Sequence, residues 1–160
     1  MTDTDPTPQD AGWIRAAMEE ARACEAAGEV PVGALVVASG VVVGRGQNRV
    51  LRDMDPTAHA EIVALREAAA TVGNYRLIEC ELYVTLEPCA MCAGAMVHAR
   101  VKRLVYGAAD PKAGAAGSVL GVVNHPMLNH QMEVTAGVLA EECGQMLRDF
   151  FRAKRGQADL

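Results

Sequence analysis

The sequence predicts a single layered α/β domain built around a mixed β-sheet. Segments with helical spacing of apolar residues alternate with short β-rich runs, which is typical of layered α/β proteins. The first two β-rich runs are joined by the turn Ser39-Gly40, so part of the sheet is expected to be antiparallel. The 160 residues suit one domain, and no internal repeat, low-complexity tract or linker divides them.

The first predicted helix covers residues 11–27. Asp10 is expected to cap its N-terminus and Gly28 to follow its C-terminus. One apolar stripe, formed by Ile14, Ala17, Met18 and Ala21, is expected to face the core. The β-rich runs 33–39 and 41–46 follow it as a predicted hairpin.

A second helix is predicted over residues 58–72, with Thr57 as its cap and Gly73 as its stop. The alternating residues 81–86 predict a strand. Pro88 is expected to open a third helix over residues 89–99, because proline fits a first helical turn.

In the last third of the chain, residues 103–107 predict a strand and residues 108–117 a loop of small residues. A short helix is predicted over residues 118–123, a strand over 132–135 and a C-terminal helix over 139–154. We expect residues 1–9 to be a disordered leader, because the first ten residues contain two prolines and three aspartates. Residues 10–155 are then one domain, followed by a tail over residues 156–160.

Composition excludes several classes of protein. Hydrophobic residues make up 51% of the chain and charged residues 22%, which is ordinary for a globular domain. The formal net charge of −5 argues against a protein that coats nucleic acid through many phosphate contacts. The N-terminus has no secretory pattern, and no apolar run is long enough to span a membrane. The odd number of cysteines, five, indicates a reducing compartment, where a close cysteine pair favours a metal or catalytic site.

Two short motifs carry the chemistry, and each stands at the start of a predicted helix. In the first, His59-Ala60-Glu61, the histidine offers a neutral imidazole; in the second, Cys89 and Cys92 are three residues apart and can reach one ion. Imidazole and thiolate are ligands that zinc prefers, and three protein ligands plus water are typical of a catalytic zinc site. Glu61 is expected to accept a proton from the zinc-activated water and deliver it elsewhere.

The remaining cysteines and histidines have plainer interpretations. Cys24, Cys80 and Cys143 are expected to fill the core as small apolar side chains. His98 and His125 are expected to be surface or structural residues, whereas the role of His130 stays open. No convincing fourth ligand is found.

The combination of these motifs, with a strand between them, is the known signature of zinc-dependent base deaminases, which include tRNA adenosine deaminases. Over about residues 10–155 the chain resembles the bacterial-type tRNA-specific adenosine deaminases of the cytidine-deaminase-like superfamily. The resemblance extends to the segments 29–34, 48–49, 55–61, 74–77, 82–96, 112–118, 129–130 and 149–152 and to Gly107 and Asp110.

This resemblance implies a three-layer α/β/α fold with a mixed five-stranded sheet, one Zn²⁺ per subunit and a cytoplasmic homodimer. It implies that the substrate is the anticodon stem-loop of tRNA, whose wobble adenosine (position 34) is deaminated hydrolytically to inosine.

The same resemblance implies roles for individual residues. His59, Cys89 and Cys92 would hold zinc, and Glu61 would shuttle protons. Asn48 and the backbone around Ala60 would contact and orient the target base, in a pocket lined by Pro31, Val32 and Leu86. The residues expected to touch the anticodon nucleotides or their backbone are Asp110, Lys112, Asn129, Phe151 and Arg155.

Two alternatives stay open from the motifs themselves. The first is a deaminase of free cytosine, guanine or a nucleoside on the same fold, since the zinc motif does not separate these substrates. The second is a structural zinc module or RNA-binding module without catalysis. Glu61 and the missing fourth ligand speak against the second, and the segments 112–118 and 129–130 with the basic C-terminal residues favour tRNA over free bases.

Overall fold

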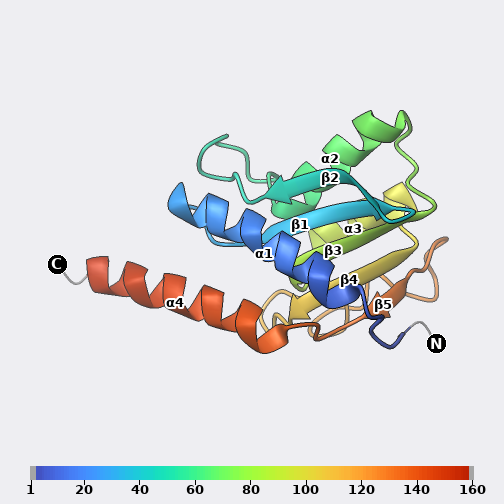
Figure 1. The fold of residues 1–160 in the computed structure, drawn as a ribbon. Coiled ribbons are helices and arrows are strands. Elements are labelled where there is room, and N and C mark those ends of the chain that lie inside the picture. The colour runs from blue at the N-terminus through green and yellow to red at the C-terminus, as the bar shows by residue number, and fades with distance from the viewer. Residues whose placement is uncertain (1–2, 159–160) are drawn as a thin grey trace.

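The computed structural model describes residues 3–158, which form a three-layer α/β/α structure (Figure 1). Within these residues, five strands make one mixed sheet in the order β2-β1-β3-β4-β5, so the predicted fold class is confirmed. The elements in chain order are α1 (Asp10–Ala26), β1 (Gly33–Ala38), β2 (Val41–Gln47), α2 (Ala60–Val72), β3 (Cys80–Leu86), α3 (Ala90–Ala99), β4 (Arg103–Ala108), β5 (Glu133–Thr135) and α4 (Ala140–Ala158).

The strand directions bring several element ends to one edge of the sheet. Strand β1 runs antiparallel to both β2 and β3, whereas β3, β4 and β5 are parallel. The carboxyl ends of β2, β3 and β4 therefore meet at the edge where β1 begins. Helices α2 and α3 start after β2 and β3, so both begin near this edge, where open α/β sheets bind their ligands.

Alternating side chains of the strands build a core on each face of the sheet. On β1, Leu35 and Val37 face α1 and α4, whereas Ala34 and Val36 face α2 and α3. This alternation is the period of two that a strand buried on both faces requires. The expected apolar stripe of α1 is buried in the first of these cores, and the filler role expected for Cys24, Cys80 and Cys143 agrees with their burial.

Two glycines in the edge strand β2 let α2 lie directly against the strand backbone. A Cβ atom built on Gly46 would lie 2.0 Å from the carbonyl oxygen of Ala60, and one on Gly44 would lie 2.3 Å from that of Ala64. Both contacts are on α2, whose alanines at positions 60, 64 and 68 are fully buried. Any larger side chain on this part of β2 would push α2 away from the sheet.

The expected helix ends are partly corrected. Asp10 does not cap α1, because Gln9 occupies the cap position and Asp10 lies inside the first turn. Thr57 does not cap α2 either: it donates a hydrogen bond to Asp55, and His59 is the cap residue. Gly73 is confirmed as the end of α2, with the positive φ of +80° that glycine adopts without strain.

The helix expected over residues 118–123 is wrong. The segment forms turns closed by a single bridge between Ala116 and Gly121, because its backbone donors bond to a buried carboxylate and to neighbouring carbonyls. The C-terminal helix is longer than expected and continues through Ala158, into the region expected to be a tail. Figure 1 shows α4 projecting beyond the sheet. Among the described residues, no helix is long and apolar enough to cross a membrane.

The described part of the expected leader, residues 3–9, packs against the rest of the protein. The Thr4 amide donates a 2.7 Å hydrogen bond to the carbonyl of Val134 in β5. The Thr7 amide and hydroxyl both donate to the Asp10 carboxylate. The composition of this segment did not predict these contacts. Residues 1–2 lie outside the described part of the chain.

Asp10 joins α1 to the sheet through a buried ion pair. Its carboxylate, fully buried, accepts hydrogen bonds from both terminal nitrogens of Arg103 at 2.6 and 3.0 Å. Arg103 also donates to Glu81 and to Thr135 of β5. Burial alone would raise the pKa of the Asp10 carboxyl, but hydrogen bonds from Arg103 and Thr7 bring the pKa below its usual value.

We predict that Asp10→Asn lowers the free energy of unfolding by about 3 kcal/mol near neutral pH, because it leaves the buried Arg103 without its main counter-charge. Since the folded pKa of Asp10 is lowered, its stabilisation is complete above the ordinary carboxyl pKa and is lost as pH falls through the folded value. The difference from the unmodified chain should therefore shrink in acid. Urea unfolding followed by the fluorescence of Trp13, the single tryptophan, measures both effects.

The matched control is Asp53→Asn, which removes an ion pair with Arg49 at the surface and should change stability little. Equal losses in the two variants, or a difference that does not depend on pH, would contradict the role given to Asp10.

Candidate metal centre and active site

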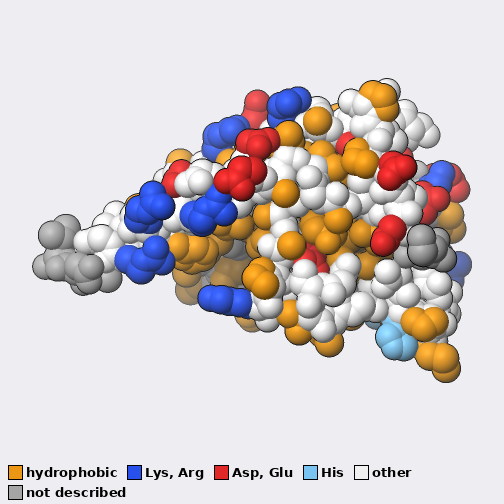
Figure 2. Space-filling view, turned by 90° about the horizontal axis from the view of Figure 1, so that it is seen from below, with side chains coloured by type: hydrophobic (Ala, Val, Ile, Leu, Met, Phe, Trp, Pro, Cys, Tyr) orange, Lys and Arg blue, Asp and Glu red, His pale blue; other side chains and the backbone are white. Residues whose placement is uncertain are grey.

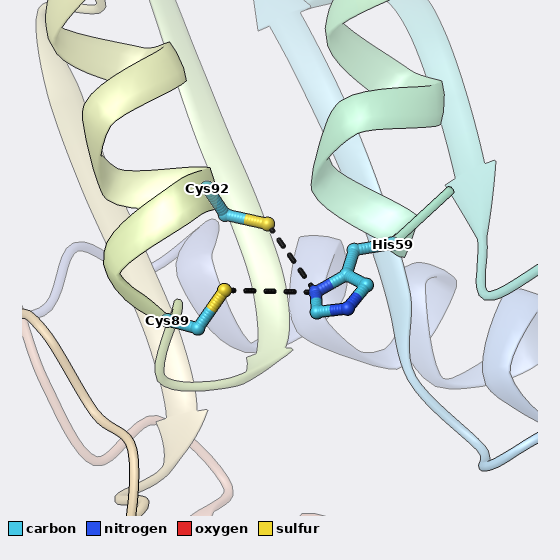
Figure 3. A group of neighbouring side chains, drawn as sticks. All are labelled: His59, Cys89 and Cys92. Carbon is cyan, nitrogen blue, oxygen red and sulfur yellow. Dashed lines mark hydrogen bonds between the residues drawn. The ribbon is translucent and has the colours of Figure 1, made fainter. Parts of the chain in front are cut away.

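Three side chains from two helix starts converge on one point. The Nδ1 atom of His59 lies 3.6 Å from the Sγ atom of Cys89 and 3.6 Å from that of Cys92 (Figure 3). The ligand atoms of these residues all lie within 4.8 Å of one another. Within residues 3–158, no further histidine, cysteine, aspartate or glutamate belongs to this group.

The local backbone explains why the three side chains meet. His59 and Cys89 are the cap residues of α2 and α3, both with extended backbone angles, and neither side chain caps its helix. Cys92 lies one turn further along α3 and is fully buried. Pro88 therefore precedes the cap residue and does not occupy the first helical turn. Because α2 packs directly on Gly44 and Gly46, its first residues lie close to the start of α3.

The protonation of the cluster suits a metal ion. Hydrogen bonds with Cys92 and His59 lower the pKa of the Cys89 thiol to about 3. The hydrogen bond with Cys89, together with burial, raises the pKa of Cys92. The pair thus holds one thiolate and one thiol, and a bound cation would displace the remaining proton. Two sulfurs and one imidazole nitrogen fit zinc and leave a position open for a further ligand.

Glu61 lies in the first turn of α2, two residues after His59. Its side chain is almost fully buried, with 4% of the residue exposed, and burial raises the pKa of its carboxyl to about 7. It borders the same cavity as His59 and Cys89. From the sequence, His59 was expected to lie inside the helix. In the structure, His59 is instead the cap residue with an extended backbone, whereas Glu61 is helical. This difference in backbone conformation lets both side chains reach the cavity.

The cavity next to the cluster has a volume of about 260 Å³. Five of the residues expected to contact the target base or the nucleotides around it border this cavity: Val32, Asn48, Ala60, Leu86 and Asp110. Pro31 is buried beside Val32 but is not among the lining residues. Its apolar lining residues include Val32 and Leu86, and Asn48 and Glu61 contribute polar groups.

Asn48 is held by two backbone hydrogen bonds. Its Nδ2 atom donates to the carbonyl of Val30, and its Oδ1 atom accepts from the amide of Val50. A carboxamide has two donors and two acceptor sites, so one donor and one acceptor remain for a ligand. The side chain is therefore fixed in orientation and still able to contact a base.

The other expected contact residues lie outside this cavity. Lys112, Phe151 and Arg155 border a separate hollow of about 420 Å³ together with Leu147, Arg148 and Arg152 of α4. Figure 2 shows basic side chains gathered over this projecting helix. Asn129 accepts a hydrogen bond from Arg100 after the far end of α3, in a third hollow at the opposite edge of the sheet. Asn129 of the same chain is therefore remote from the metal cluster.

Sequence reasoning assigned no role to two buried carboxylates that hold the walls of the cavity. Glu29 accepts hydrogen bonds from the backbone amides of Leu51 and Arg52, just after Asn48. Glu87 accepts from the amides of Asp110, Ala116 and Ser118. Both residues stand in segments that resemble the deaminase family, but only the structure shows which loops they bind.

Comparisons with known proteins agree with this site. The family model of MafB19-like deaminases matches residues 9–155. A tRNA-specific adenosine deaminase of Haemophilus influenzae is 52% identical over 152 residues, covering 94% of this chain and 88% of that protein. A tRNA-specific adenosine deaminase of Bacillus subtilis is 46% identical, covering 92% and 91%.

Solved structures show the same fold. One, from a study of A-to-I editing by tRNA:A34 deaminases at the wobble position of transfer RNA, superposes with a TM-score of 0.82 at 43% identity. The superposition covers 85% of this chain and 99% of the chain in that solved structure. A guanine deaminase of Nitrosomonas europaea superposes with a TM-score of 0.74 at 29% identity, covering 90% and 84%.

The fold, the histidine–cysteine cluster and these matches define a deaminase of the MafB19-like family. Within that family, the chain belongs with the tRNA-specific adenosine deaminases, which confirms the resemblance found in the sequence.

We predict that the purified protein contains one zinc ion per chain and that Cys92→Ser abolishes this content, because a hydroxyl does not supply a thiolate ligand. Cys80→Ala is the matched control, since Cys80 is also buried but lies outside the cluster. Elemental analysis of the two variants measures the effect. A Cys92→Ser protein that retains one zinc per chain would contradict the assignment.

Proposed function

We propose that this protein is a zinc-dependent hydrolase that converts adenosine to inosine at the wobble position of a tRNA anticodon. The observation that carries the proposal is the placing of Glu61 beside the His59–Cys89–Cys92 cluster in one cavity. A zinc ion held there supplies Lewis acidity, which makes a water molecule nucleophilic near neutral pH. The overall reaction adds water at C6 of adenine and releases the amino group as ammonia.

In this proposal each residue has a separate task. Glu61 would accept one proton of the attacking water and deliver it to the ring nitrogen next to C6. It would then take the second proton from the new hydroxyl at C6 and give it to the amino group, which leaves as ammonia while C6 becomes a carbonyl. Asn48 uses its remaining donor and acceptor to orient the base, as its fixed carboxamide allows. Val32 and Leu86 line the base pocket and exclude water from the reacting atoms.

The size of the cavity supports a substrate of which only one base enters. At about 260 Å³ it lies just below the ~300–1,000 Å³ of sites that bind whole drug-sized ligands. An enzyme that attacks a ring carbon must take the base out of its stack, so the flanking nucleotides stay outside. The neighbouring hollow, bordered by Lys112, Phe151 and Arg155, offers positive charge and an exposed aromatic ring for them.

This local charge reconciles an RNA substrate with the net charge of −5. Lys112 and three arginines of α4 border one hollow, and the ion pairs seen in residues 3–158 include none with Lys112 or Arg155. An anticodon loop presents only a few phosphates to a protein of this size, so a small basic surface serves it.

We further propose that the protein works as a homodimer in the cytoplasm. A shallow, mostly apolar hollow lies between α2 and α3, and the exposed side chain of Tyr75 borders it. None of the five cysteines forms a disulfide in the structure, as a reducing compartment requires. Light scattering distinguishes a mass of 16.9 kDa from twice that value.

Glu61→Gln is expected to keep its zinc and to lower single-turnover deamination by at least about 10²- to 10⁴-fold, because an amide does not carry the proton. Glu67→Gln on the exposed face of the same helix is the control and should behave as the unmodified chain does. Rapid-quench kinetics with parallel metal analysis separate loss of chemistry from loss of zinc. Near-normal turnover by Glu61→Gln with zinc bound would rule out the proton-shuttle role.

An anticodon stem-loop with adenosine at the wobble position should have a far higher kcat/KM than free adenosine, cytosine or guanine. The flanking nucleotides supply remote binding energy that holds the base at the metal. The same stem-loop with its adenosine moved by one position is the control and should react slowly. Faster turnover of any free base or nucleoside would instead favour the free-base deaminase that shares this fold.

A further inference from the structure

Glu87 is a buried carboxylate that binds one loop through four hydrogen bonds. It follows β3, is 2% exposed and borders the catalytic cavity. Its Oε1 atom accepts from the amide of Asp110 and from the hydroxyl of Ser118. Its Oε2 atom accepts from the amides of Ala116 and Ser118. Among the described residues, none of the ion pairs involves Glu87, so backbone dipoles and one hydroxyl balance its charge.

The loop, residues 110–118, closes tightly around this carboxylate. A Cβ atom built on Gly114 would lie 2.3–2.5 Å from the three atoms of the carboxylate group. A side chain at position 114 would therefore displace the carboxylate and disturb its hydrogen bonds, although the φ of Gly114 is not positive.

The same loop connects the two places where substrate is proposed to bind. Asp110 and Ala113 border the catalytic cavity, and Lys112 between them borders the basic hollow of α4. Its residues 111–113 form a turn in which the Asp110 carboxylate accepts the amides of Lys112 and Ala113. The hydrogen bonds from the loop to Glu87 therefore set the orientation of this turn relative to the cavity.

We propose that Glu87 is a positioning residue: it fixes the loop 110–118 so that one RNA strand contacts the cavity wall and the basic hollow at the same time. The proposal rests on the proposed function, because it concerns the substrate of that site. Glu87 does not touch the reacting atoms in this account. It acts by making the loop rigid before the RNA binds, so that binding does not have to order it.

Glu87→Gln is the sharpest test of this role. All four groups that face the carboxylate are donors, so an amide would place its own NH₂ group against two of them. Gly114→Ala disturbs the same contact from the loop side and keeps the carboxylate. Gly121→Ala is the matched control in the neighbouring turn, where an added Cβ meets only the Asn124 side chain at 3.5 Å.

The experiment uses the inactive Glu61→Gln protein and a fluorescent anticodon stem-loop. Adding Glu87→Gln or Gly114→Ala should raise the Kd by about tenfold or more, and Gly121→Ala should leave it unchanged. Zinc content should stay at one per chain. Hydrogen exchange of the Ala116 and Ser118 amides should become at least about tenfold faster in Glu87→Gln, whereas the Ala93 amide in α3 stays protected. In the active protein, Glu87→Gln should raise KM for the stem-loop and leave saturated kcat within about threefold.

Three results would overturn the proposal. The first is an unchanged Kd despite faster exchange of the loop amides. The second is a fall in kcat with unchanged KM. The third is an equal rise in Kd for Asp10→Asn, which weakens the opposite face of the sheet and so reports general destabilisation. If the Glu61→Gln parent itself does not bind the stem-loop and the unmodified chain does not deaminate it, the proposed function fails, and this inference fails with it.

Discussion

The contact between α2 and β2 is the constraint on which the site depends. At the two glycines of β2 the opposing residues of α2 are alanines, so no side chain larger than a methyl group separates the two backbones there. The backbone of α2 thereby lies directly against the backbone of β2, and this contact fixes the position of Ala60, its first residue, beside the start of α3. This contact also sets the distance from the His59 imidazole to the sulfurs of Cys89 and Cys92, because His59 immediately precedes Ala60.

Around this constraint, the protein uses buried carboxylates for two different purposes. On the face of the sheet covered by α1, the Asp10 carboxylate is neutralised by the Arg103 guanidinium, and this ion pair joins the start of α1 to the start of β4. At the catalytic edge, Glu87 instead binds amides and one hydroxyl of a loop, and none of the ion pairs seen in residues 3–158 involves it. Glu29 combines both means, because it accepts from the amides of Leu51 and Arg52 and also pairs with the Arg52 side chain. Amide dipoles thus accommodate the negative charge of Glu87 without a cationic side chain beside it.

The sequence was sufficient for much of the fold, for physical reasons that differ between elements. The strand over residues 81–86 was predicted from its alternating pattern, and the runs that begin at residues 33 and 103 from their β-rich composition. Helix starts were less well predicted: Asp10 and Thr57 are typical cap residues, but a tertiary ion pair and an Asp55 turn compete for them. The segment 118–123 was expected to be helical, but its backbone amides bond instead to the buried carboxylate of Glu87 and to the carbonyls of Gly114 and Ala115.

The metal cluster could be predicted because zinc ligands have few residue types and a fixed helical spacing. The carboxylate walls could not, because Glu87 and Ser118 are thirty-one residues apart and nothing local marks either of them. The location of Asn129, remote from the cluster, likewise depends on the path of the chain after β4. No role was assigned to Gly44 and Gly46 from the sequence, because only the structure shows that α2 lies on them.

The most direct test of this account is the zinc affinity of Gly46→Ala, a change that leaves every proposed ligand in place. The added Cβ would lie 2.0 Å from the Ala60 carbonyl, so α2 must shift and carry His59 with it. We expect the zinc dissociation constant to rise by about tenfold or more and deamination to fall with it, while Gly12→Ala on open space in α1 changes neither. A folded Gly46→Ala protein that binds zinc and turns over as the unmodified chain does would show that the site does not depend on this seating.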